Sequence, residues 1–256
     1  MQFMDKPYRN LLREMTFSQF AVRDQNSVLG MLWSFVNPVL MVGVLFAYFR
    51  MNAGATIQHY GIYLLFGMIH YTHFSNTTAA AMNSLSGMAQ LTRHTVLPKE
   101  VLVIGSVLAT SMEFAVSMAF CLVLACITGV PITGGMAILP AVILLQLMFV
   151  MWVSLLLAAA RVFVKDLTHL YQVFLRLLFF TTPIFYAAAF LRNPFAQRML
   201  RFNPLAQLIG FSRTLVIEGQ WISWKLFLAL CVIHALALWG AFRCFKRYEP
   251  RFAEYV

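Results

Sequence analysis

The chain has 256 residues, of which 61% are hydrophobic and only 11% carry a charge. Soluble domains carry charge on about 25% of their residues, because their surfaces must face water. This composition therefore excludes an ordinary soluble domain and favours a membrane protein. The formal net charge of +10 is not gathered into a basic stripe. Attraction to anionic headgroups and control of topology explain the charge better than nucleic-acid binding does, and we expect no nucleic-acid partner.

Residues 1–27 are predicted to form a cytoplasmic helix that lies in the membrane interface. Apolar side chains such as Leu12, Met15 and Phe20 can share one helical face, while the arginines of the segment lie elsewhere. This pattern suits a helix lying flat at the level of the headgroups. An ordinary polar N-terminal helix is the alternative.

Six apolar runs are long enough to cross a bilayer, which takes roughly 20 helical residues. They lie at residues 28–49, 60–81, 101–128, 136–160, 167–189 and 222–242. Residues 204–216 are also apolar but too few to span, so they are predicted to be re-entrant or interfacial. The predicted fold is an all-α membrane protein, with a single transmembrane domain over residues 1–256. Lysine and arginine are more abundant in the loops on the side of the N-terminus, which predicts that both termini are cytoplasmic.

Two charged residues lie inside predicted spans, Glu113 in the third and Arg176 in the fifth. A charge within a span is costly and usually faces protein or water. We expect the two side chains to form a pair or to line a polar cavity. The alternative is that each snorkels or bonds to a neighbouring helix separately.

The second span is unusually polar and aromatic from Tyr60 to Thr78. A helix facing lipid would not keep so many polar groups unpaired, and hydroxyls with aromatic faces suit the polar edges and apolar faces of sugar rings. An aromatic belt combined with helix-to-helix hydrogen bonds is the alternative. His70 and His73 have a spacing that could bind a metal, but no third ligand is evident, and we expect no metal.

Two prolines and the absence of several catalytic motifs allow further predictions. Pro38 and Pro183 lie within predicted spans and should kink or break their helices. The chain has no phosphate-binding loop, no nucleophile elbow and no HExxH motif. The sequence therefore predicts a chain that is not an enzyme, binds no cofactor and cannot hydrolyse ATP.

Five segments carry motifs in order along the chain. Residues 23–38 contain a basic residue, then S-x-L-G-x-x-W, then N-P. The others are L-P-K-E at the end of residues 91–100, F-V-K-D-L at 163–167, T-P-I-F-Y at 182–186, and N-P-L at 203–205 followed by Arg213. Together these motifs resemble the permease subunits of ABC exporters for polysaccharides and polyol phosphates.

This resemblance implies a homodimer of permeases in the bacterial inner membrane, served by two ATP-binding subunits that bind ATP and Mg. The substrate would be a glycan linked to polyprenyl pyrophosphate, exported from cytoplasm to periplasm. The implied channel residues are Trp33, Tyr60, Tyr63, His70, Tyr71, His73, Phe74, Asn76 and Thr77. The residues implied to dock the ATP-binding subunit are Gln90, Leu91, Arg93, His94, Pro98 and Lys99. Arg9, Arg13 and Arg23 would meet lipid headgroups or the carrier pyrophosphate, with positive-inside anchoring as the alternative.

The pair Asn37-Pro38 favours an O-antigen-like glycan, because capsule exporters of this group more often carry E-P here. Capsule and teichoic-acid export stay open as alternatives. A small-molecule ABC permease of the same fold is a rival that would have a more apolar cavity. A membrane-embedded glycan or lipid transferase is a rival of another class, but it would need convergent carboxylates or histidines at one membrane face.

Overall fold

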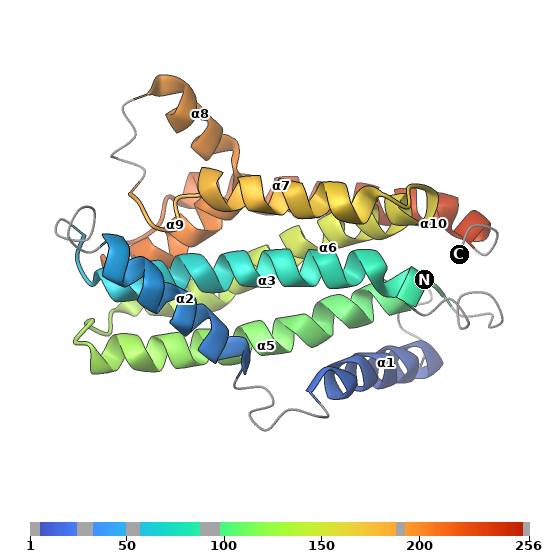
Figure 1. Ribbon diagram of the computed structural model, residues 1–256, viewed down its shortest axis with the longest axis horizontal. Helices are drawn as coiled ribbons and strands as arrows, with labels where there is room; N and C mark the ends of the chain where they lie inside the picture. The colour runs from blue at the N-terminus through green and yellow to red at the C-terminus, as the bar shows by residue number, and fades with distance from the viewer. Residues whose placement is uncertain (1–5, 25–32, 50–56, 88–97, 188–192, 253–256) are drawn as a thin grey trace.

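The computed structural model describes residues 6–24, 33–49, 57–87, 98–187 and 193–252, and within these ranges all regular structure is helical. The elements are α1 (Lys6–Asp24), α2 (Trp33–Phe49), α3 (Tyr60–Gly87), α5 (Glu100–Ile127), η3 (Gly134–Ile138), α6 (Leu139–Phe163), α7 (Leu167–Thr181), α8 (Pro194–Phe202), α9 (Pro204–Val216), α10 (Trp224–Tyr248) and η5 (Glu249–Arg251). The long helices run along one axis (Figure 1). The start of α5 and the end of α10 share one end of the bundle, and α8 and α9 lie toward the other (Figure 1).

Among the described helices, three are both long and apolar enough to cross a membrane: α5, α6 with the η3 turn before it, and α10. The apolar part of α2 is shorter. Helix α3 has 28 residues but contains the polar stretch. These helices show a membrane protein, while the count of six spans, the interfacial position of α1 and the re-entrant position of residues 204–216 stay predictions.

The bounds of several predicted spans differ from those of the helices; the sixth, 222–242, was predicted too short, because α10 continues to Tyr248. The fifth, 167–189, was predicted too long, because α7 ends at Thr181. A residue that precedes a proline is disfavoured in helical conformation, and Thr182, which precedes Pro183, is extended with φ −93° and ψ 136°. The second, 60–81, was predicted too short, because α3 continues to Gly87. Pro38, by contrast, lies inside α2, which continues through it.

Helix α3 is the centre of the bundle. It contacts α2, α5, α6, α7 and α9, and Figure 1 shows it between α7 and α5, with α2 in front. Its buried residues therefore lie on every side of the helix. Since α3 also carries the polar stretch, its polar side chains must be satisfied by neighbouring helices or by a cavity.

Helix α1 packs along the first half of α5. The Gln19 Nε2 amide donates to the Leu102 carbonyl at 3.2 Å. A Cβ at Gly105 would stand 3.4 Å from that amide nitrogen and 3.5 Å from the Met15 Cβ, so this glycine permits the close approach. Part of the apolar face of α1 is thus used against α5.

Candidate functional site

The two histidines of α3 belong to a buried hydrogen-bond network at the centre of the bundle. The side chain of Gln146 on α6 contacts Nδ1 of His70, and its Nε2 donates to the His70 carbonyl at 3.1 Å and to Nδ1 of His73 at 2.9 Å. Ser212 on α9 donates to Nε2 of His70 at 2.8 Å. Nε2 of His73 contacts the Ser111 hydroxyl on α5 at 3.2 Å. The network therefore joins four helices.

Each donor in this network meets an acceptor when both histidines are neutral. The Gln146 amide nitrogen must donate, so Nδ1 of His73 accepts and its Nε2–H donates to Ser111. Ser111 in turn donates to the Val107 carbonyl at 2.6 Å. Because all four ring nitrogens are engaged, His70 and His73 are packing residues between helices. The expectation that His70 lines a channel is corrected: its side chain is fully buried among helices.

Replacing Gln146 by methionine is expected to lower stability by about 2 kcal/mol, since three hydrogen bonds between helices are lost at roughly 0.6 kcal/mol each in a membrane protein. The measurement is thermal unfolding in detergent. Gln220→Met is the matched control, because the Gln220 side chain is exposed. Equal melting of the two variants would contradict the role of the network.

The tyrosines of α3 also bond within the protomer. Tyr60 donates to the Phe185 carbonyl at 2.8 Å, Tyr63 to the Tyr186 carbonyl at 3.0 Å, and Tyr71 to the Leu175 carbonyl at 2.8 Å. These bonds tie α3 to α7 and to the segment that follows it. Phe74 stacks on Phe149 with ring centroids 5.0 Å apart. These contacts match the alternative of helix-to-helix bonding better than an open channel lining.

A polar cavity lies where α2 crosses α3 and α5. It is narrow, about 50 Å³. Its lining comprises Trp33, Asn37, Pro38, Ile69, Thr72, His73, Asn76, Thr77, Thr110, Glu113, Phe114 and Ser117. The structure thus brings four of the predicted channel residues together with Glu113. The exposed side of this lining is formed by Trp33, which is 47% exposed, and by Asn37 and Asn76.

A second cavity of about 280 Å³ adjoins the first on the other flank of α2. Its lining comprises Asn37, Pro38, Met41, Met68, Tyr71, Thr72, Arg176, Phe179 and Phe180. Asn37, Pro38 and Thr72 belong to both cavities. We call the two cavities together the α2 groove. Glu113 and Arg176 therefore lie on opposite flanks of α2, and the described ion pairs lie elsewhere. The expected direct pair is not formed, while each of the two residues lines a cavity.

Arg213 organises the end of the bundle that carries α8 and α9. The residue is 5% exposed, and its guanidinium donates to the carbonyls of Tyr63, Pro183 and Ile184 at 2.6 to 3.1 Å. It also lies 3.4 Å from the Tyr63 ring centroid, a cation–π contact. Two of these carbonyls, those of Pro183 and Ile184, lie in the non-helical segment after α7 and gain their donor from this arginine. A Cβ at Gly67 would lie 2.6 Å from Arg213 Nη2, so glycine is required there.

Asn203 connects two sequence motifs that lie 21 residues apart in the chain. Its side chain accepts from the backbone amides of Leu205 and Ala206, which caps α9. Its amide also donates to the Thr182 hydroxyl at 3.1 Å. The N-P-L and T-P-I motifs therefore meet in space. Sequence reasoning placed Arg213 only in a motif and missed that it is a buried structural residue.

A groove of about 490 Å³ runs beside the contact between α1 and α5. Arg9 and Arg13 lie at it beside Leu12, Thr16 and Phe17, and its α5 side consists of Leu108, Ser111, Met112 and Ala115. Both arginine side chains are exposed. The groove thus combines cationic groups with an apolar wall. The side chain of Arg23 lies outside what the structure describes.

Most of the predicted docking residues fall in the range 88–97, which lies outside the described residues; these are Gln90, Leu91, Arg93 and His94. Pro98 and Lys99 are described and lie directly before α5. The backbone amide of Lys99 donates to a carboxylate oxygen of Glu249 at 2.7 Å. The docking role itself stays a prediction.

Apolar helices around a hydrogen-bonded centre, with one polar and one mainly apolar cavity beside α2, are typical of an integral membrane permease. Residues 10–216 match the family described as ABC-2 type transporter. The chain belongs to this family and is a transmembrane permease of an ABC transporter.

Its relatives carry a more specific name. The chain is 28% identical over 250 residues to the O-antigen export system permease protein RfbA of Myxococcus xanthus, covering 97% of this chain and 96% of the relative. It is 26% identical over 211 residues to a protein of the same name from Klebsiella pneumoniae, covering 82% and 81%. A second such protein from that organism is 24% identical over 246 residues, covering 96% and 94%.

Proposed function

We propose that this chain is the membrane subunit of an ABC exporter that moves a polysaccharide linked to polyprenyl pyrophosphate, of the O-antigen kind, from the cytoplasm to the periplasm. The observation that carries the proposal is the α2 groove. It places amides, hydroxyls, an aromatic ring and two charged groups along one open side of the protomer. The names of the relatives support the choice of substrate.

The chemistry of the groove suits a glycan. Asn37 and Asn76 are exposed and offer donors and acceptors to sugar hydroxyls, and the exposed Trp33 offers an aromatic face to the apolar side of a sugar ring. The cavity beside Trp33 holds only about 50 Å³. Passage of a glycan therefore requires α2 to move away from α3 and α5.

A second copy of the chain would close the groove from the outside. Arg176 is exposed on α7, surrounded by the exposed apolar residues Val173, Phe174, Leu177 and Phe180. An arginine at this place is costly against lipid tails but not against a water-filled path. In a dimer whose two α7 faces border a common water-filled path, Arg176 can face water while the apolar residues around it pack against the second copy. The homodimer is part of our proposal for this reason.

The carrier headgroup would enter at the groove between α1 and α5. Arg9 and Arg13 can form charge-assisted hydrogen bonds with phosphate oxygens, while Leu108, Met112 and Ala115 provide an apolar wall for the prenyl chain. A groove of about 490 Å³ leaves room for such an amphipathic ligand. A membrane phospholipid also has a phosphate group and apolar chains, so it would compete with the carrier for this groove.

The energy source in this proposal is a pair of ATP-binding subunits that hold ATP and Mg²⁺. They would dock at the end of the bundle where α5 begins and α10 ends, which is the cytoplasmic side in a bacterial inner membrane with both termini inside. Basic residues Lys99, Lys246, Arg247 and Arg251 gather near this end, as the positive-inside rule requires. The permease chain itself has no catalytic role.

The proposal is tested with the purified complex of this chain and its ATP-binding subunit in proteoliposomes. We expect polyprenyl-pyrophosphate-linked glycan to stimulate ATP hydrolysis severalfold and to cross the bilayer only with ATP, while the carrier without glycan does neither. The matched control is the same complex with an ATP-binding subunit that binds but does not hydrolyse ATP. Transport by this chain alone without nucleotide, or stimulation by apolar small molecules but not by glycan, would overturn the proposal.

A further inference from the structure

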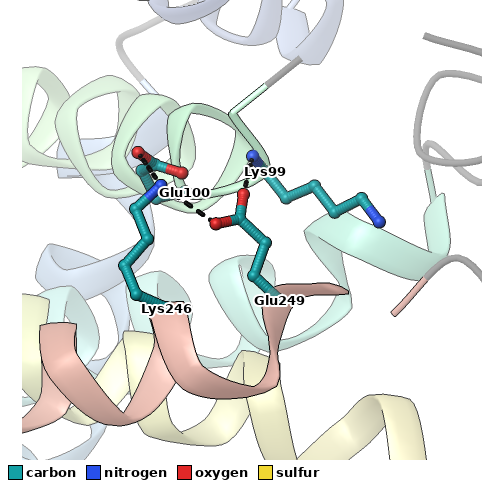
Figure 2. Close-up of polar contacts among 4 residues, drawn as sticks. All are labelled: Lys99, Glu100, Lys246 and Glu249. Carbon is teal, nitrogen blue, oxygen red and sulfur yellow. Dashed lines mark hydrogen bonds and ion pairs between the residues drawn. The ribbon is translucent and has the colours of Figure 1, made fainter. Parts of the chain in front are cut away.

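The chain folds its last described turn back onto the start of α5. Figure 2 shows Glu249, directly after α10, with one carboxylate oxygen bonded to the Lys99 backbone amide at 2.7 Å. Its other oxygen contacts Lys246 at 2.9 Å, and Lys246 reaches Glu100 at 2.6 Å (Figure 2). Two acidic groups and one cation thus join positions that are about 150 residues apart in the sequence.

Glu249 acts on α5 as a capping residue supplied from another helix. The first amides of a helix have no partners inside it, and the Lys99 side chain makes no capping bond. The Glu249 carboxylate accepts from the amide of Lys99, the residue directly before the helix, and lies at the positive end of the helix dipole. Its contact therefore stabilises the first turn of α5 and holds that turn against α10.

Lys246 is needed because Glu100 is buried. The Glu100 side chain is 2% exposed, and a buried carboxylate is costly unless it is paired. Lys246 provides that pair and also neutralises part of the charge on Glu249. Tyr8 of α1 is buried nearby, and burial together with the negative charge of Glu100 and Glu249 raises the pKa of its hydroxyl. The cluster thus lies where α1, α5 and α10 meet.

Phe252 adds α6 to the same junction. It is fully buried, with its ring centroid 5.1 Å from that of Phe245 on α10 and 6.0 Å from that of Phe163 at the end of α6. Residues 249–252 therefore tie the ends of α5, α6 and α10 together. We call Lys246, Glu249 and Phe252, with their contacts to Lys99 and Glu100, the C-terminal brace.

We propose that the C-terminal brace couples ATP hydrolysis to movement of the α2 groove. The inference rests on the proposed function, in which the segment before α5 contacts the ATP-binding subunit. Lys99 and Glu100 lie where that segment enters the bundle. Helix α5 then runs about 20 Å, at 1.5 Å per residue, to Glu113 in the groove. A force on the start of α5 reaches the groove when that start is held against α6 and α10, and is dissipated in local movement when it is not.

The brace residues are thus positioning residues, and the test is the number of glycans moved per ATP hydrolysed. We expect Glu249→Ala to lower this ratio fivefold or more in proteoliposomes containing equal amounts of assembled complex. Glu249→Gln should restore a large part of it, because its amide oxygen can still accept from the Lys99 amide. Arg243→Ala is the matched control, since it removes an exposed charge six residues earlier on α10 and should leave the ratio unchanged.

If Glu249→Ala moves as many glycans per ATP hydrolysed as the parent chain does, the proposed role of the C-terminal brace is wrong. If that variant does not assemble, Glu249→Gln decides: a ratio lowered about twofold with normal assembly supports the proposal, and a ratio equal to that of the parent chain refutes it. The parent complex separates this proposal from the proposed function. Failure of the parent complex to move glycan refutes the function, whereas normal transport with an insensitive ratio refutes only the brace.

Discussion

Arg213→Met is expected to lower the melting temperature of the detergent-purified chain by roughly 10 °C, the largest effect on stability among the substitutions proposed. The side chain is nearly the same length but donates no hydrogen bond. Three buried carbonyls, those of Tyr63, Pro183 and Ile184, lose their donor. A buried group left without its partner costs about 1–3 kcal/mol, and each kcal/mol lowers the melting temperature of a chain of this size by about 2–4 °C.

Two variants separate the hydrogen bonds of Arg213 from its charge and location. Arg213→Lys keeps the charge but cannot reproduce the planar set of donors, so an intermediate melting temperature is expected. Arg201→Met alters an exposed arginine that lines, together with Arg213, a cavity of about 490 Å³ beside α8 and α9, and this variant should melt like the parent chain. A melting temperature of Arg213→Met within 2 °C of that of the parent chain corresponds to a loss of at most roughly one kcal/mol of stability. That result would show that the carbonyls near Pro183 do not need the hydrogen bonds of Arg213.

Arg176→Met is expected to reduce glycan export at least tenfold while the complex with the ATP-binding subunit assembles normally. The proposed path places this guanidinium in water beside the glycan and opposite the second copy. Removing it takes away the charged group of the cavity between α2 and α7. The measurement is export in cells or proteoliposomes, normalised to the amount of assembled complex.

The lipid-facing alternative predicts the opposite sign for Arg176→Met. An arginine held against lipid tails costs about 2.5–3.5 kcal/mol in insertion measurements, so its removal would raise stability and leave export unchanged. Arg176→Lys keeps the charge and should retain most export. Leu177→Met, on the neighbouring exposed surface of α7, should behave like the parent chain. A stabilised Arg176→Met variant with full export would refute the proposed path at this face.

For the polar stretch of α3, the sequence predicted the environment of the side chains but not their partners. Its polarity predicted that the helix does not face lipid, and the structure provides its partners. Whether those partners are sugars or other helices depended on Gln146 and Ser212, which are 76 and 142 residues away from His70 in the sequence. No local pattern links residues at such distances. Asn76 and Thr77 do reach a cavity, although they share a helix with the buried His70.

For the two intramembrane charges, too, the sequence predicted the kind of environment but not the arrangement of the helices around them. The cost of a charge in a span predicted that Glu113 and Arg176 face protein or water, and both line cavities. The sequence could not show that α2 passes between them. Their separation follows from how α2 crosses α3, which is set by side-chain packing over many residues.

By itself the sequence determined that the chain is helical and lies in a membrane, and it marked Pro183 as a place where a helix should kink or break. These properties follow from composition and local backbone chemistry, which act over a few residues. Only the tertiary structure decided that Arg213 closes the break at Pro183, that Glu249 caps α5, and that one part of α3 bonds to helices while another lines a groove. Such contacts depend on the rotation and crossing of helices, which are set by side-chain packing across the whole bundle and not by any local pattern.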